Sequence, residues 1–293
     1  MRQDGDSAVE VINSAEEMQQ VAEELRLSGK TLALVPTMGF FHEGHLELMR
    51  IARRHADVVM ISLFVNPTQF GPTEDLSTYP RDLEGDLSKA AEVGVDFAFV
   101  PSDQEMYPHD FQTKVSVEKV TNHLCGISRP THFDGVTTVV AKLFHITKPH
   151  IAVFGQKDFQ QLTVVSRMVK DLNMDVRIVG VPTVREPDGL AMSSRNVYLN
   201  PEERKSALSI KKSLDLARDL VKQGEVQSDK LIKAVKDLIL SSPHTQIDYV
   251  NLCDPMTMED VETLKGETLL ALAVRVGGTR LIDNCLLGGD ENK

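Results

Sequence analysis

The sequence has few cysteines and no long hydrophobic run. Cys125, Cys253 and Cys285 are odd in number and far apart, and no pair has the spacing of metal ligands. We therefore expect reduced thiols in a cytoplasmic protein rather than a disulfide framework. The longest apolar stretches, such as residues 58–65, are too short to span a bilayer. The first 30 residues lack the basic start and apolar run of a signal peptide.

Basic residues are also scarce, because 32 Lys and Arg stand against 43 Asp and Glu, which gives a net charge of −11. An acidic surface repels nucleic acid and anionic lipid, so neither nucleic acid nor a membrane is expected as a partner. An anionic small substrate would need a local positive pocket. The content of hydrophobic residues, 41%, is that of an ordinary globular protein with one large domain or two modest ones.

Strands and helices are predicted to alternate over the first 180 or so residues. Short apolar segments typical of buried strands lie at 31–36, 58–65, 96–100, 151–154 and 175–181. Segments with helical periodicity lie at 14–27, 45–55, 82–93, 135–144 and 158–172. This alternation predicts a doubly wound α/β fold, in which right-handed crossovers build a parallel sheet covered on both faces.

The pattern changes after Leu199. Two charged, amphipathic helices are predicted at 201–223 and 228–241, and short strands follow at 247–252, 268–276 and 281–284. We expect residues 1–185 to form a Rossmann-like domain and residues 186–293 to form a smaller α+β domain. The polar residues 1–9 are expected to fray.

The turn after strand 31–36 carries the first chemical signal, in the sequence PTMGFFHEGH. Ligands of doubly wound sheets bind beyond the carboxyl ends of the strands, and a helix N-terminus suits phosphate. His42 and His45 are three residues apart, so both imidazoles can reach one phosphate and stabilise charge in an adenylyl-transfer transition state. Alternatively, the histidines only cap the helix or face water. A zinc site would need a third ligand, and none is evident.

A second signal lies at residues 185–196, with the sequence REPDGLAMSSRN. Ser193 and Ser194 offer hydroxyls and Arg195 offers a guanidinium, all of which suit phosphate oxygens. Alone, such a segment is a common solvated loop. Together with the histidine turn, it is typical of adenylyl-transferring Rossmann-like enzymes, in which a loop of this kind closes over the triphosphate.

Two further segments follow predicted strands and so lie on the ligand side of the sheet. Asn66 and Gln69 can hydrogen-bond hydroxyl or carboxylate groups, unless residues 65–71 are an ordinary polar loop. Lys157 can neutralise a phosphate, and Gln161 lies one turn into the following helix. Asp158 either caps that helix or holds the ATP ribose or magnesium.

Five motifs make the chain resemble the pantothenate synthetase (pantoate–β-alanine ligase) family over roughly Val9 to Asn284. They are PTMGFFHEGH, FVNPTQFGPTEDLSTYPRDLEGD, HFDGVTTVVAKLF, FGQKDFQQL and REPDGLAMSSRN, in that family's order and spacing. One departure is the Phe40-Phe41 pair, where the family more often has smaller aliphatic residues. This pair affects the expected pocket shape rather than the chemistry.

The resemblance implies that ATP and pantoate form pantoyl adenylate and pyrophosphate with Mg2+, and that β-alanine then releases AMP and pantothenate. It implies a cytoplasmic homodimer whose C-terminal domain acts as a lid. His45 would be the general acid and His42 would help stabilise the charged phosphates. Lys157, Ser193 and Arg195 would also contact the phosphates, and Lys157, Ser194 and Arg195 would be catalytic with the two histidines. Gln69, Gln161 and Asn66 would hold pantoate, with Gln69 also near β-alanine. The implied ATP-binding residues are Met38, Gly39, Phe40, Phe41, His42, Glu43, Gly44, His45, Gly155, Gln156, Lys157, Asp158, Val184, Met192, Ser193, Ser194 and Arg195.

Two rival functions remain open from the sequence. A nucleotidyltransferase of the same superfamily would share the histidine turn but would not require Asn66, Gln69 and Gln161. A non-catalytic nucleotide-binding protein would be expected to lack at least one of His45, Lys157, Ser194 and Arg195, and all four are present. The sequence does not identify which of Asp82, Asp86 and Asp158, if any, contacts magnesium.

Overall fold

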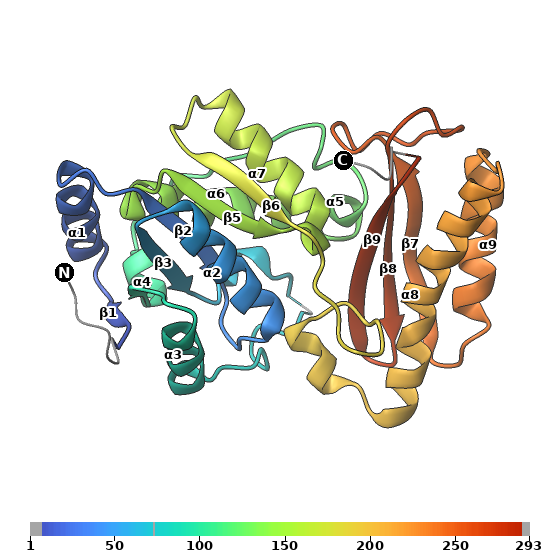
Figure 1. Cartoon of the computed structure of the whole chain (residues 1–293), viewed down its shortest axis with the longest axis horizontal. Helices are drawn as coiled ribbons and strands as arrows, with labels where there is room; N and C mark the ends of the chain where they lie inside the picture. Colours follow the sequence, from blue (N-terminus) through green and yellow to red (C-terminus); the bar gives the residue numbers. More distant parts are fainter. Residues whose placement is uncertain (1–7, 73, 289–293) are drawn as a thin grey trace. The chain divides into compact units, whose positions relative to one another are not determined.

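A computed structural model describes residues 8–72 and 74–288. Residues 1–9 were predicted to fray, and positions 1–7 of this stretch lie outside the described residues. The chain divides into two compact units, whose elements are labelled in Figure 1. Unit 1 comprises residues up to 117, 129–156 and 164–182, and unit 2 comprises 118–128, 157–163 and 183 onward. The domain boundary placed after residue 185 stays a prediction.

Unit 1 is built on a parallel sheet of six strands in the order β1-β4-β3-β2-β5-β6. Because every neighbouring pair is parallel, the predicted α/β class is confirmed. The edge strand β1 was not predicted from the sequence. The strands are β1 Glu10–Ile12, β2 Leu32–Thr37, β3 Val58–Leu63, β4 Phe97–Phe99, β5 Ile151–Gly155 and β6 Arg177–Val181.

Helices connect these strands, and most begin where the sequence predicts. Ser14 caps the first helix by accepting a hydrogen bond from the backbone N–H of Glu17, as its position before an apolar periodic run indicates. The helices are α1 Ala15–Leu27, α2 Glu43–His55, α3 Leu83–Glu92, α4 Asp103–Met106, α6 His132–Thr147 and α7 Phe159–Asp171, whose first turn belongs to unit 2.

Both faces of the central strands β2 and β3 are buried. One face packs Ala33 and Val35 against Leu46 and Met49 of α2. On the face against which α1 and α6 pack, Leu32 and Leu34 of β2 are also fully buried. Since β2 and β3 pair in register from Leu32 opposite Val58 to Thr37 opposite Leu63, their carboxyl ends lie side by side.

Unit 2 contains an antiparallel sheet in the order β7-β8-β9, packed with two helices around one core. Burial raises the pKa of the Cys253 thiol to about 12 and that of Cys285 to about 11, so both buried thiols remain protonated at neutral pH. The elements are α5 Cys125–Ser128, α8 Pro201–Lys222, α9 Ser228–Leu240, β7 Thr245–Cys253, β8 Thr268–Val276 and β9 Thr279–Leu287.

Across residues 8–72 and 74–288, no helix has both the length and the apolar character needed to cross a membrane.

Candidate active site

The turn between β2 and α2 has an unusual backbone conformation. Gly39 has φ +84° and Phe40 has φ +53°, so two successive residues occupy the left-handed region. A residue with a side chain rarely adopts this conformation unless other contacts hold it there. Both oxygens of the Asp86 carboxylate, on α3, accept backbone N–H groups of the turn, from Phe40 and Phe41, each at 2.6 Å. Nζ of Lys89, one turn further along α3, donates to the Phe41 carbonyl at 2.9 Å.

The two histidines of the turn lie against each other at the N-terminus of α2. Their ring centroids are 4.1 Å apart with an interplanar angle of 30°. The backbone N–H of His42 donates to Nδ1 of His45 at 3.3 Å. An Nδ1 that accepts a hydrogen bond leaves the proton of a neutral imidazole on Nε2. His45 therefore presents a donor from Nε2, as hydrogen bonding to a phosphate oxygen requires.

Phe41 and Phe40 differ in their surroundings. Phe41 is 3% exposed, belongs to the core beneath α2, and lies 5.3 Å from the His45 ring between centroids. Phe40 is partly exposed. The buried Phe41 ring therefore supports one side of the His45 imidazole.

A cavity of about 840 Å³ opens at the carboxyl ends of β2, β3 and β4 within unit 1. The position beyond the strand ends is the one expected for a ligand site in a doubly wound sheet. Its walls combine apolar side chains with acidic residues and one arginine. The lining residues include Met38, Gly39, Phe64, Phe70, Glu74, Arg81, Asp82, Asp86 and Asp103.

Gln69 and Asn66 lie together in the segment after β3. The Gln69 side chain donates from Nε2 to the Met38 sulfur at 3.1 Å, and Oε1 accepts from Nδ2 of Asn66, also at 3.1 Å. Asn66 is only 1% exposed, and its amide also contacts Tyr107 and the Gly135 carbonyl. The structure thus places Asn66 beneath Gln69 and surrounds it with protein groups.

Arg129 and His132 support the same segment; neither was assigned a role from the sequence, although His132 begins the motif HFDGVTTVVAKLF. Both Nη2 of Arg129 and Nδ1 of His132 lie within hydrogen-bond distance of the Gln69 carbonyl oxygen, at 3.1 and 2.9 Å. Arg129 also binds both carboxylate oxygens of Glu74 at 2.6 Å. Burial acts to raise the pKa of Glu74, but the bonds from Arg129 outweigh it, so the pKa is lowered. The Gln69 backbone is therefore held from two further positions.

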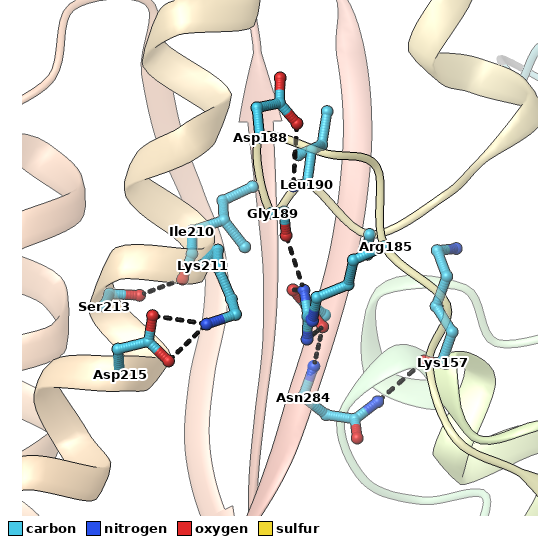
Figure 2. A network of polar contacts seen from close by, with 12 residues as sticks. Lys157, Arg185, Asp188, Gly189, Leu190, Ile210, Lys211, Ser213, Asp215 and Asn284 are labelled. Atoms are coloured by element: carbon cyan, nitrogen blue, oxygen red, sulfur yellow. Dashed lines mark hydrogen bonds and ion pairs between the residues drawn. The ribbon is translucent and has the colours of Figure 1, made fainter.

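Lys157 and Asp158 follow β5 in a short 3-10 turn at Gln156–Asp158 that continues into α7. Nζ of Lys157 lies 3.9 Å from the Asp158 carboxylate. Figure 2 shows the Asn284 amide reaching the Lys157 carbonyl, with a distance of 2.9 Å from Nδ2 to the oxygen. Gln161 is partly exposed, whereas its neighbour Gln160 is buried and bonded to the carbonyls of residues 120 and 123. Of these two glutamines, Gln161 is the one with an accessible side chain.

The segment that carries Ser193, Ser194 and Arg195 is folded back on itself in unit 2. Met192 N–H donates to the Val184 carbonyl at 3.0 Å, and Arg185 pairs with Ala191 in an isolated β-bridge. The Ser193 hydroxyl accepts the Arg195 N–H at 3.3 Å and caps the 3-10 helix Ser194–Tyr198. The serines and the arginine are thereby presented from one short turn.

An ion pair anchors the start of this segment. Arg185 donates from Nη1 and Nη2 to the two oxygens of Asp283, at 2.7 and 2.9 Å. Figure 2 shows the same guanidinium reaching the Gly189 carbonyl. Asp283 lies on β9 and is 2% exposed, so the pair is largely removed from water. The segment is therefore fixed to the sheet of unit 2 at its first residue.

These features define a class of protein: a parallel-sheet α/β protein with a histidine-bearing helix start beyond the strand ends and a separate serine- and arginine-bearing turn. The sequence model of one family, described as pantoate-beta-alanine ligase, matches residues 10–286. The chain therefore belongs to the pantoate-beta-alanine ligase family, and it condenses pantoate with β-alanine.

Related proteins of known identity agree with this assignment. The chain is 56% identical to the pantothenate synthetase of Syntrophus aciditrophicus (strain SB) over 284 residues, which cover 97% of this chain and 99% of that one. A crystal structure of pantothenate synthetase from Thermus thermophilus has 43% identity and a TM-score of 0.89, covering 94% and 99% of the two chains.

A pantoate-beta-alanine ligase from Francisella tularensis has been solved in complex with beta-gamma ATP and β-alanine. It has 32% identity and a TM-score of 0.78, with 95% of this chain and 98% of that chain covered.

Proposed function

We propose that the condensation runs through pantoyl adenylate. The pantoate carboxylate attacks the α-phosphorus of ATP and displaces pyrophosphate, and the β-alanine amine then attacks the acyl carbon, releasing AMP and pantothenate. A free carboxylate is a poor electrophile, and adenylation gives it a good leaving group. The observation that best supports this route is the pair of adjacent imidazoles, His42 and His45, at the N-terminus of α2, in which Nε2 of His45 is a hydrogen-bond donor. The complex of the Francisella tularensis relative supports ATP and β-alanine as co-substrates.

The residues at the family's ATP-binding motif positions are proposed to bind ATP. Backbone N–H groups at the start of α2 favour phosphate, and Lys157 and Arg195 supply positive charge in an acidic protein. His45 acts as the general acid, and His42 stabilises the charged phosphates. The proposed ATP-binding residues are Met38, Gly39, Phe40, Phe41, His42, Glu43, Gly44, His45, Gly155, Gln156, Lys157, Asp158, Val184, Met192, Ser193, Ser194 and Arg195.

Pantoate is held by Gln69 and Gln161, with Asn66 beside Gln69. The Gln69 amide oxygen accepts from Asn66, whereas its Nε2 donates to the sulfur of Met38, a weak acceptor that a ligand oxygen would replace. A donor is the group that a carboxylate or hydroxyl oxygen needs. The cavity beyond β2, β3 and β4 gives apolar surface for the aliphatic body of a small hydroxy acid.

Magnesium would be carried mainly by the triphosphate, where it neutralises charge on the departing pyrophosphate. The described residues contain no cluster of three His, Cys, Asp or Glu side chains that could hold a metal. Both oxygens of Asp86 already accept backbone N–H groups, whereas Asp158 is exposed. Of these two aspartates, Asp158 therefore has the more available carboxylate for an ion on ATP.

The family resemblance also implies a cytoplasmic homodimer. A molar mass twice that of the chain, measured by sedimentation at micromolar concentration, would agree with this part of the proposal. A chain that sediments as a monomer at that concentration would contradict it.

The adenylate route is tested by two assays on the same enzyme. Exchange of labelled pyrophosphate into ATP should require D-pantoate and Mg2+ but not β-alanine, and net AMP release should require all of them. His45→Ala should lower both by about 100-fold or more. His55→Ala, at the exposed end of the same helix, is the matched control and should retain activity.

The same assays separate the rival functions. Exchange that is indifferent to pantoate would indicate another adenylyl acceptor, as in a nucleotidyltransferase. ATP binding without exchange or AMP release would indicate a non-catalytic nucleotide-binding protein. Either result would overturn the proposed route.

A further inference from the structure

The α3 helix makes a specific contact with the histidine-bearing turn of unit 1. Asp86 is 1% exposed, and its two carboxylate oxygens each bond one backbone N–H of successive residues, Phe40 and Phe41. Buried carboxylates are costly unless hydrogen bonds compensate the lost water. Burial raises the pKa of Asp86, and the two N–H bonds oppose that rise. Keeping this carboxylate charged and buried therefore has an electrostatic cost. Its hydrogen bonds fix Phe40 and Phe41, which lie 46 and 45 positions earlier in the chain.

Asp86 holds the turn in a backbone conformation that residues with a side chain rarely adopt. Phe40 has φ +53°, in the region that residues with a β-carbon avoid. Its N–H is directed at Asp86 in this conformation. Released from the carboxylate, Phe40 would move to a common backbone region, and the direction of the chain entering α2 would change.

The fit between α3 and the turn is close on both sides. A β-carbon on Gly39 would lie 3.0 Å from Oδ2 of Asp86, so only glycine leaves room for the carboxylate at its observed position. Lys89, three residues after Asp86, donates to the carbonyl of Phe41. The peptide groups of Phe41 are thus held at both ends, at N–H by a carboxylate and at C=O by an ammonium group.

His42 follows immediately and caps α2, with His45 in its first turn. The stacking of the two imidazoles and the bond from His42 N–H to Nδ1 of His45 depend on the direction in which the chain enters the helix. A reacting group displaced by about 1 Å can cost on the order of 100-fold in rate.

We propose that Asp86 is a positioning residue for the reaction with ATP: its carboxylate locks Phe40 in the left-handed conformation and so fixes the stacked His42–His45 pair at the start of α2. This inference rests on the proposed role of His45 in adenylate formation. In this role Asp86, which also lines the cavity, acts through the backbone of the turn rather than by contact with the reacting atoms, and Lys89 assists it from the same helix.

The test is a double-mutant comparison, since glycine adopts the left-handed conformation without strain. Asp86→Asn removes one acceptor and should lower the rate of pantoate-dependent pyrophosphate exchange about 100-fold while KM for pantoate changes by less than about threefold. In a Phe40→Gly background, the same Asp86→Asn substitution should cost less than about tenfold, because the backbone no longer needs to be held. Glu92→Gln, an exposed residue at the end of α3, removes the same charge from the same helix and serves as the control.

Two outcomes would overturn the proposal. One is a normal exchange rate in Asp86→Asn; the other is an equal loss in the wild-type and Phe40→Gly backgrounds, as expected of a residue that acts only through stability or by direct contact with ATP. If Asp86→Asn does not fold, Lys89→Met replaces it, since it removes the bond to the Phe41 carbonyl and the positive charge near Asp86 but keeps both Asp86 bonds to the turn. An exchange rate within about twofold of the wild type would then refute the role of α3. A His45→Ala variant with full exchange activity would instead refute the proposed function and leave the contact itself unexplained.

Discussion

Nδ2 of Asn66 donates a hydrogen bond to Oε1 of Gln69 at 3.1 Å, and the polarity of this bond is fixed by backbone groups. Oδ1 of Asn66 accepts the backbone N–H of Thr68, which can only donate, and Nδ2 donates to the carbonyl of Gly135, which can only accept. The amide of Asn66 therefore has one orientation. Because Nδ2 faces Gln69, the Gln69 side chain must present its own Nε2 toward the sulfur of Met38.

Asn66→Asp is expected to reverse the Gln69 amide. A carboxylate at position 66 can only accept, so Gln69 would turn its Nε2 inward and present an oxygen to the pantoate carboxylate. KM for pantoate should rise about tenfold or more, with a smaller effect on KM for ATP. Initial rates of AMP formation at varied pantoate and at varied ATP provide the two constants.

Tyr107→Phe is the control for this substitution. It removes one donor to Oδ1 of Asn66 but leaves the Thr68 hydroxyl at 2.9 Å and the Thr68 N–H, so the amide orientation should persist. KM for pantoate should change by less than about threefold. A larger effect of Tyr107→Phe than of Asn66→Asp would be inconsistent with orientation of Gln69 by Asn66.

Asn284→Ala is expected to weaken ATP binding through Lys157. The substitution removes the bond from Nδ2 of Asn284 to the Lys157 carbonyl, which helps fix the backbone from which the lysine side chain extends (Figure 2). KM for ATP should rise about fivefold to tenfold, as for loss of one hydrogen bond of about 1 kcal/mol. Titration of ATP binding by calorimetry measures the effect directly, and an unchanged affinity would show that Lys157 is positioned without Asn284.

Asp283→Ala is expected to destabilise unit 2 strongly. Removal of the carboxylate leaves the Arg185 guanidinium without its partner in a site where the Asp283 side chain is 1% exposed. Breaking a buried pair in this way costs about 3 kcal/mol or more of unfolding free energy. Urea denaturation measures this free energy. In the control Asp237→Ala, which breaks the exposed Lys233–Asp237 pair on α9, the unfolding free energy should fall by less than about 1 kcal/mol.

The pair between Glu74 and Arg129 should make stability depend on pH. The pKa of Glu74 is lowered in the folded protein, from a reference value of 4.5. A carboxyl group with a depressed folded pKa contributes stability that is present above its unfolded pKa and is lost as pH falls through its folded pKa. Thermal unfolding should therefore show Glu74→Gln less stable than the wild type at pH 7, and the difference should shrink below about pH 4.5. A difference that stays constant down to about pH 3 would exclude a charge effect.

Local sequence signals were enough for most elements and for the histidine turn. The apolar run at 58–65 predicted β3 because strands covered on both faces carry few polar residues. Ser14 and Glu17 marked the start of α1, and the alternation of strands and helices predicted the parallel sheet. The His42 and His45 positions followed from the same logic, since a strand–glycine–helix junction has its chemistry within about ten residues.

Strands with buried polar groups were harder to predict. β9 extends over Thr279–Leu287, whereas only residues 281–284 were expected, because the polar residues along this segment leave no continuous apolar run to mark its ends. The structure buries Asp283 by pairing it with Arg185, almost a hundred positions earlier in the chain. β1 was missed because it has three residues, of which only Ile12 is buried.

The sequence by itself determined the fold class, the family and the residues of the histidine and serine–arginine segments, because each depends on neighbours within one turn or one strand. Only the tertiary structure decided the strand order, the support of Gln69 by Arg129 and His132, and the hold of Asp86 on Phe40 and Phe41. These contacts join parts of the chain whose proximity depends on how the strands and helices pack. No local pattern encodes them, because a buried carboxylate and a solvated one look the same in a sequence.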